Sequence, residues 1–307
     1  MTHLSKKPTI IIGLSGGPDS VYLLHKLISQ KCSEPNFTLI AAHLDHEWRK
    51  DSHKDVEFCE QLCKKLNVTF VSKKASELSI NIKYNGSQEE VGRKLRRYFF
   101  EQLAQEYNAN EIVLGHHADD QLETFFIRLF RGTTTHGLAC MKQRDGLYSR
   151  PLLNISKQKI LDWLKENNKD YLEDPTNNSD KYLRNKIRNS VLPALKACDN
   201  RFEQNTIRAI KHIQNTERFL QEHTKKTYEQ LLDEKKELNL KQFFTLDPYL
   251  QKRILQHWLV QNKATHILSD ALLKEILRFL ESPRGGSHQI STQWKIIKKQ
   301  SKAQIVS

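Results

Sequence analysis

The 307-residue chain carries 49 lysines and arginines against 36 acidic residues, a formal net charge of +13. No apolar run approaches the roughly 20 residues of a membrane-spanning helix, and the five cysteines include no C-x-x-C pair. Composition therefore excludes a helical membrane protein and a disulfide scaffold, and it predicts a cytoplasmic protein with reduced thiols and no membrane partner. The basic charge favours a polyanionic partner such as nucleic acid, although lysine used for solubility is an alternative reading.

A glycine-rich turn follows the first predicted strand, residues 10–12, and leucines at helical spacing come directly after it. The turn reads SGGPDS over residues 15–20. Its glycines let backbone N–H groups approach a ligand, and the helix start adds a positive dipole, so the turn suits a phosphate. Asp19 beside a phosphate requires a cation between them, which predicts Mg²⁺ bridging Asp19 and a pyrophosphate. A plain glycine turn with Asp19 as a helix-start charge is the alternative.

Strands and helices alternate along the next hundred residues. Strands are predicted at residues 36–42, 68–71 and 111–114, and helices at 53–66, 88–107 and through Phe130, with Gly132 as the stop. This alternation predicts a doubly wound parallel sheet. Polar residues begin where two strands stop, at His43 and at Gly115. Because carboxyl ends of parallel strands meet at one edge, these residues should converge beside the glycine turn.

His116, Asp120 and Thr124 recur every four residues, so they are predicted to share one helix face near the nucleotide. Asp119 is expected to cap this helix, a role that explains Asp120 less well. Two histidines beside two aspartates also suggest zinc, but no second histidine or cysteine set completes four ligands. The helix predicted at residues 88–107 has a basic face that includes Arg96. At least one arginine on this face is expected to be simply exposed to solvent, with no functional role.

The second half is more basic and looks divided. A polar segment at residues 174–181 precedes helices at 182–196 and 202–224. From residue 238, Asp247 and Ser269 are expected to cap two helices, and an alternating segment around Trp294 predicts a short hairpin. We predict an α/β catalytic domain at residues 1–200, a helical connector at 201–237, and a small α+β domain at 238–307.

Motifs in the same order resemble those of the tRNA(Ile)-lysidine synthetases. The glycine turn alone resembles only the wider superfamily of PP-loop, Rossmann-like ATP pyrophosphatases. The further motifs are His43-Leu-Asp-His46 with Trp48-Arg49, Arg93-Lys-Leu-Arg96, His116 through Thr124, Arg131-Gly-Thr, Arg150-Pro-Leu-Leu153, Asp174 through Asp180, and Tyr182-Leu-Arg184-Asn185-Lys-Ile-Arg188. The chain departs from the family pattern at Gly92, where alanine is expected, at Arg97 for tyrosine, and at Thr134 for glycine.

The resemblance implies an enzyme that ligates free L-lysine to the 2-position of the wobble cytidine of isoleucine tRNA with a CAU anticodon. The cytidine is first adenylated by ATP with Mg²⁺, which releases pyrophosphate, and the lysine amine then displaces AMP. The small C-terminal domain would help to seat the tRNA, and the second C-terminal domain of longer members is expected to be absent. A homodimer is left open.

The resemblance and the residue chemistry together assign the site. The expected ATP-binding residues are Ser15, Gly16, Gly17, Pro18, Asp19 and Ser20, with Asp19 as the Mg²⁺ ligand. The expected catalytic residues are Asp45, Arg96, His116 and Asp120, and the expected tRNA-binding residues are Arg131, Arg184, Asn185 and Arg188. Asp120 or His116 would accept a proton from the lysine ammonium. Arg96 would stabilise phosphoryl charge, and Asp45 would hold Mg²⁺ or the ammonium.

Two other functions on the same fold are less consistent with the sequence. A related PP-loop enzyme that makes 2-thiocytidine would carry cysteine pairs, and none is present. A catalytically inactive RNA-binding protein on the same fold would have no use for clustered acids such as Asp19, Asp45 and Asp120 at a phosphate site.

Overall fold

The computed structural model describes residues 7–33, 36–80, 88–173, 183–264 and 269–307, so the polar segment predicted at 174–181 lies outside the described residues. The chain divides into two compact units, Met1–Gln214 and Asn215–Ser307. This division falls inside one long helix, α9 (Phe202–Leu231). The three-part division at residues 200 and 237 stays a prediction. Among the described helices, none is both long and apolar enough to cross a membrane.

The first unit is built on a six-stranded sheet of order β3-β2-β1-β4-β6-β5. All neighbouring strands are parallel except β5 and β6, which confirms the predicted α/β fold. The chain leaves β1 in one direction to β2 and β3 and returns to its other side at β4, so the order reverses between β1 and β4. The strands are β1 (Thr9–Gly13), β2 (Thr38–Asp45), β3 (Thr69–Lys74), β4 (Glu111–Val113), β5 (Arg144–Asp145) and β6 (Tyr148–Ser149).

Strand β2 continues beyond its predicted end at residue 42. Its register with β3 reaches Asp45 opposite Lys74, so His43 and Asp45 belong to the strand instead of following it. Both side chains are buried, and the ladder satisfies the backbone groups of these polar residues as it does those of apolar ones. The predicted boundary was wrong, while Asp45 still lies at the carboxyl end of the strand.

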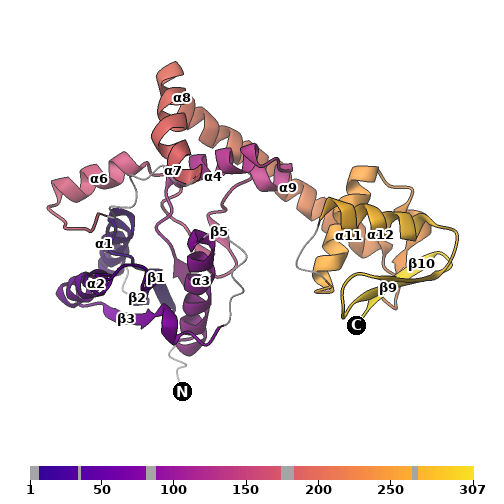
Figure 1. Cartoon of the computed structure of the whole chain (residues 1–307), viewed down its shortest axis with the longest axis horizontal. Helices are drawn as coiled ribbons and strands as arrows, with labels where there is room; N and C mark the ends of the chain where they lie inside the picture. Colours follow the sequence, from indigo (N-terminus) through magenta and orange to yellow (C-terminus); the bar gives the residue numbers. More distant parts are fainter. Residues whose placement is uncertain (1–6, 34–35, 81–87, 174–182, 265–268) are drawn as a thin grey trace. The chain divides into compact units, whose positions relative to one another are not determined.

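Helices cover both faces of this sheet (Figure 1). Ile12 of β1 packs in one core with Leu24 and Leu164, whereas its neighbour Ile11 packs in another with Phe99. Successive strand residues therefore face opposite layers, as expected for a parallel sheet buried on both sides. The first core includes α1 (Pro18–Ser33), α2 (His53–Lys65) and α6 (Lys157–Glu166), and the second includes α3 (Gln88–Glu106). A 3₁₀ turn, Ala75–Glu77, follows β3.

Helix α4 (Ala118–Phe130) begins later than predicted. His117 is its extended N-cap residue, and the Asp120 carboxylate accepts the backbone N–H of His117 at 3.0 Å. His116 therefore precedes the helix and does not share its face with Thr124. Asp120 makes the capping contact, whereas the alternative, non-functional interpretation of the sequence assigned a capping role to Asp119. Gly132 follows the end of α4 at a φ of +66°, as expected for a helix stop.

Short helices complete the first unit: α5 (Thr135–Leu138), α7 (Leu183–Lys186), a π-helical turn (Ile187–Val191) and α8 (Leu192–Cys198). Helix α9, predicted to end at residue 224, continues to Leu231.

The second unit combines a four-stranded antiparallel sheet, ordered β7-β10-β9-β8, with three helices. Asp247 accepts the N–H of Tyr249 at 2.8 Å and Ser269 accepts that of Leu272 at 3.1 Å, so both predicted caps are confirmed. The predicted hairpin is β8 and β9. The elements are β7 (Leu238–Asn239), α10 (Leu240–Phe243), α11 (Pro248–Gln261), α12 (Asp270–Glu281), β8 (Gly286–Gln289), β9 (Lys295–Lys299) and β10 (Lys302–Val306).

Candidate active site

The glycine turn is held in shape by its own serines. Ser20 Oγ donates to the carbonyl of Gly17 at 2.9 Å and accepts the N–H of Ser15 at 3.2 Å. Gly16 has a φ of +82°, and a Cβ there would lie 2.7 Å from Leu172 Cδ1, so the position favours glycine. Helix α1 begins at Pro18, directly after the second glycine. The turn therefore presents backbone N–H groups and a helix N-terminus to an anion, as predicted for a phosphate.

Three carboxylates surround the buried imidazole of His117. Its Nε2 lies 3.7 Å from Asp19 Oδ1 and 3.5 Å from Asp120 Oδ2, and its Nδ1 lies 3.7 Å from Asp119 Oδ1. Burial opposes protonation of His117, but the neighbouring carboxylates outweigh it and raise its pKa. His117 thus joins the aspartate of the glycine turn to the two aspartates that begin α4.

Lys157 belongs to the same cluster and was missed in the sequence. Its ammonium contacts both carboxylate oxygens of Asp19, at 2.7 and 2.8 Å, and its backbone N–H donates to Asp119 Oδ1 at 3.0 Å. Lys157 is the first residue of α6, a helix that was not predicted. The available signal was Ser156, which accepts the N–H of Lys159, followed by apolar residues at helical spacing.

The described residues contain no group of three or more histidine, cysteine or acidic side chains that could hold a metal ion alone. Mg²⁺ is commonly held by one or two carboxylates together with substrate phosphates. Asp19 fits that pattern, because it lies in the glycine turn, carries hard oxygen donors and is partly exposed. Its present partner is the Lys157 ammonium, which a divalent cation would have to replace.

A buried carboxylate collects two of the predicted tRNA-binding arginines. Glu123 on α4 is fully buried and accepts hydrogen bonds from Arg184 Nε at 2.7 Å and from Arg188 Nε at 2.6 Å. Arg184 also contacts Glu89 at 2.9 Å and Asp120 at 3.4 Å. Burial acts against the charge on Arg184, yet Asp120 and Glu123 raise its pKa. These arginines thus lie beside the acid cluster, and their contact with RNA stays a prediction.

His116 and Asp120 carry opposite tendencies at the start of α4. Burial lowers the pKa of His116 to about 4, and nearby arginines add to this effect against the pull of Asp120. Burial would raise the pKa of Asp120, but His117, His116 and Arg184 outweigh it and lower that pKa. At neutral pH the site therefore holds a neutral His116 beside an ionised Asp120. His116 Nδ1 is buried with no hydrogen-bond partner in the described part of the chain.

The other four predicted site residues, Asp45, Arg96, Arg131 and Asn185, belong to four different elements of the first unit. Asp45 is buried at the end of β2 and accepts the N–H of Glu47 at 2.8 Å. Arg96 is exposed on α3, and its charge lowers the pKa of His116. Arg131 is the exposed C-cap of α4, at the opposite end of that helix from Asp120. Asn185 lies half-buried on α7.

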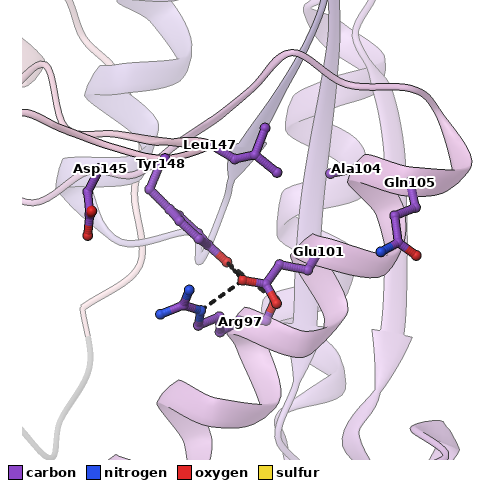
Figure 2. Close-up of a pocket in the computed structure, with 8 residues that line it drawn as sticks. Arg97, Glu101, Ala104, Gln105, Asp145, Leu147 and Tyr148 are labelled. Carbon is purple, nitrogen blue, oxygen red and sulfur yellow. Dashed lines mark hydrogen bonds and ion pairs between the residues drawn. The ribbon is translucent and has the colours of Figure 1, made fainter. Parts of the chain in front are cut away.

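A cavity of about 380 Å³ lies between α3 and the β5–β6 hairpin and contains none of the predicted site residues (Figure 2). Arg97 Nε donates to Glu101 at 2.8 Å, and the Tyr148 hydroxyl donates to the same carboxylate at 3.3 Å. Arg97, which departs from the family pattern, therefore lines this cavity and is paired with Glu101. The Thr134 departure precedes α5, and its side chain makes no cap hydrogen bond.

The buried histidines predict a pH-dependent stability. Burial lowers the pKa of His46 to about 4, as it does for His116. Between about pH 4 and pH 6.5 these two histidines are protonated in the unfolded chain but neutral in the folded chain. Because the unfolded state binds more protons in this range, the free energy of unfolding should rise as the pH rises from 4 to 6.5. His46→Phe should reduce this slope by up to about 1.4 kcal/mol per pH unit. Urea unfolding of the first unit across this range tests it, with exposed His53→Phe as the control. An unchanged slope for His46→Phe would contradict it.

The fold and the loop are those of a PP-loop domain. Residues 1–195 match the family model described as the PP-loop domain, and residues 238–300 match that of the TilS substrate binding domain. The U34-tRNA thiolase NcsA from Methanococcus maripaludis, solved with its [4Fe-4S] cluster, superposes with a TM-score of 0.59. That match covers 69% of this chain and 73% of the thiolase at 17% identity, so it shows the fold alone.

Three curated relatives show which family within the PP-loop proteins the chain belongs to. The tRNA(Ile)-lysidine synthase of Petrotoga mobilis is 35% identical over 68% of this chain and 67% of its own length. That of Bacillus cereus is 30% identical over 96% of this chain, and that of Clostridium tetani 38% over 69%. The chain belongs to the tRNA(Ile)-lysidine synthase family. It spans 64% of the length of the Bacillus cereus relative and 45% of the Clostridium tetani relative.

Proposed function

We propose that the protein uses ATP to activate the wobble cytidine of an isoleucine tRNA with a CAU anticodon and then joins L-lysine to it. One observation carries the proposal: His117 lies between Asp19 of the glycine turn and Asp120 of the acid cluster, at 3.7 and 3.5 Å. This neighbourhood supports two consecutive steps in one site, activation at the turn and attack by an amine beside the acids.

In the first step, the 2-oxo oxygen of cytosine attacks the α-phosphorus of ATP and pyrophosphate leaves. Backbone N–H groups of the glycine turn that are not bonded within the turn, together with the start of α1, would hold the leaving phosphates. Asp19 would hold Mg²⁺, which when bound would supply positive charge that stabilises the leaving pyrophosphate. The Lys157 ammonium, released from Asp19, would then face the same phosphates.

In the second step, the lysine amine attacks C2 of the adenylated base, and the bond from C2 to the AMP oxygen breaks. The lysine nitrogen attacks as a free amine and must lose protons as it bonds to C2. Ionised Asp120 would hold this nitrogen, and Asp120 or His116 would accept a proton from it once the new bond has made that proton acidic. Arg96 remains our candidate for the phosphoryl charge, and Asp45 for a second contact to the ammonium.

Binding of tRNA rests on the family match to a substrate binding domain at residues 238–300 and on the net charge of +13. Arg131 is exposed and available to an RNA phosphate, and Arg184, Asn185 and Arg188 stay candidates at the edge of the acid cluster.

Release of pyrophosphate tests the activation step. Purified protein with Mg-ATP should release pyrophosphate when unmodified isoleucine tRNA is added, and much less with a transcript that carries uridine at the wobble position. Equal release with both transcripts would contradict activation of the cytidine.

Lys157→Gln should lower the rate of tRNA-dependent pyrophosphate release by about 100-fold, because one cation beside the leaving phosphates is removed. Stopped-time assays at saturating ATP measure it. Lys159→Gln, an exposed neighbour on the same helix, is the matched control and should behave as wild type. Equal rates for the two variants would exclude Lys157 from the activation step.

A further inference from the structure

Trp48 is a large exposed side chain at the active-site edge of the sheet, and the proposed mechanism gives it no role. It follows Asp45, the last residue of β2, by three positions and is 48% exposed. Leaving an indole in water forgoes the free energy that its burial would bring. The position of this ring beside a nucleotide site makes it available to a ligand there.

The Trp48 ring is backed by the ring of His46. The two centroids lie 4.4 Å apart with an interplanar angle of 19°, which is a stacked arrangement. Neither ring nitrogen of His46 has a hydrogen-bond partner within the described segments. His46 thus covers one face of the indole as a flat support, and the Trp48 residue remains 48% exposed.

Gly92 on α3 makes room for this arrangement. A Cβ at residue 92 would lie 2.4 Å from Trp48 Cη2 and 2.8 Å from Cζ2, closer than carbon atoms can approach. The alanine expected at this position from the family pattern would therefore displace the indole. The departure at Gly92 is explained by the position of Trp48.

Glu47, the residue before Trp48, is held by two hydrogen bonds. The N–H of Glu47 donates to Asp45 at 2.8 Å, and Glu47 Oε2 accepts the N–H of Ser76 at 2.9 Å. Glu47 has a φ of +57°, an uncommon conformation that these two contacts hold. Because the ring is ordered before any ligand arrives, less entropy is lost on binding.

We propose that Trp48 is a stacking platform for a nucleobase, supplied either by the adenine of ATP or by the wobble cytosine of the RNA substrate. This inference rests on the proposed function, which brings both bases to this edge of the sheet. Aromatic side chains stack on any base, because every base presents a π face.

Equilibrium binding to Mg-ATP and to full-length isoleucine tRNA, measured for wild type, Trp48→Ala, Trp48→Phe and Gly92→Ala, tests the platform. Trp48→Ala should weaken binding of one ligand by about ten- to a hundred-fold. Trp48→Phe should retain most of the affinity, and Gly92→Ala should reproduce the loss by displacing the ring. Tyr107→Ala, an exposed aromatic residue at the end of α3, is the control.

Two further ligands identify the base. If adenine stacks on Trp48, binding of inorganic triphosphate should be unaffected by Trp48→Ala. If the wobble cytosine stacks there, a tRNA with an abasic wobble position should bind wild type and Trp48→Ala equally. Equal affinity of Trp48→Ala and wild type for ATP and tRNA would overturn the platform, as would an equal loss for the ligands that lack the base.

The two proposals fail separately. Wild-type protein that forms lysidine, with a Trp48→Ala variant that binds normally, would overturn the platform and leave the function intact. The opposite outcome has two parts: the wild-type protein forms no lysidine, and Trp48→Ala weakens binding of ATP but not of inorganic triphosphate. This result would overturn the function and support the platform.

Discussion

Asp120→Asn should reduce lysine incorporation into tRNA, and the AMP release that accompanies it, by about 100- to 10,000-fold while leaving tRNA-dependent pyrophosphate release from ATP largely intact in a single turnover. The asparagine side chain keeps the shape and an oxygen that can accept the N–H of His117, so the cap of α4 survives. What is lost is the negative charge beside His116 and Arg184. Pyrophosphate and lysidine measured from the same reaction separate the two steps.

The matched control is Asp162→Asn, an exposed aspartate on α6 that contacts Gln158. It should incorporate lysine at the wild-type rate. An Asp120→Asn enzyme with wild-type incorporation, or one that loses both steps equally, would contradict the role given to Asp120 in the amine step.

Glu123→Gln should lower the free energy of unfolding of the first unit by about 3 kcal/mol, which corresponds to a Tm decrease of roughly 5–10 °C. Glu123 is fully buried and its two oxygens accept hydrogen bonds from Arg184 and Arg188. Glutamine keeps the size of the side chain but removes the buried negative charge that the two guanidinium groups share, although Arg184 keeps its contacts with Glu89 and Asp120. Scanning calorimetry of the whole chain measures the effect on the transition of the first unit.

Glu90→Gln provides the comparison, because Glu90 forms an exposed pair with Lys94 at 3.6 Å on α3. Such a surface pair contributes about 0.5 kcal/mol or less. If the two variants were equally stable, the arginine pairs of Glu123 would not hold α7 and the π-helical turn to α4.

The parts of the fold that depend on local chemistry were predictable from the sequence. Apolar β-branched residues before SGGPDS predicted β1, and the serine and glycine chemistry of that turn predicted its anion-binding shape. Asp247 and Ser269 were predicted as caps from their place before apolar residues at helical spacing. In each case the interaction joins residues a few positions apart, so spacing alone reveals it.

Features that depend on distant contacts were not predictable. Lys157 meets Asp19 across 138 residues, and Arg184 meets Glu123 across 61. Asp45 was placed after its strand because a polar residue usually ends an apolar run, whereas the pairing of β2 with β3 decides where the strand stops. Position along the chain predicted Asp120 as a functional acid, but its role as the cap of α4 follows only from the backbone of His117.

The central claim is that this site transfers lysine to an activated cytidine. The most direct measurement is incubation of the purified chain with Mg-ATP, isotope-labelled L-lysine and unmodified isoleucine tRNA bearing a CAU anticodon, followed by nuclease digestion and mass spectrometry of the nucleosides. We expect label in a lysidine nucleoside from the wobble position, in a one-to-one ratio with AMP released. AMP release without label in any nucleoside would contradict lysine as the second substrate, and tight tRNA binding without AMP release would contradict catalysis itself.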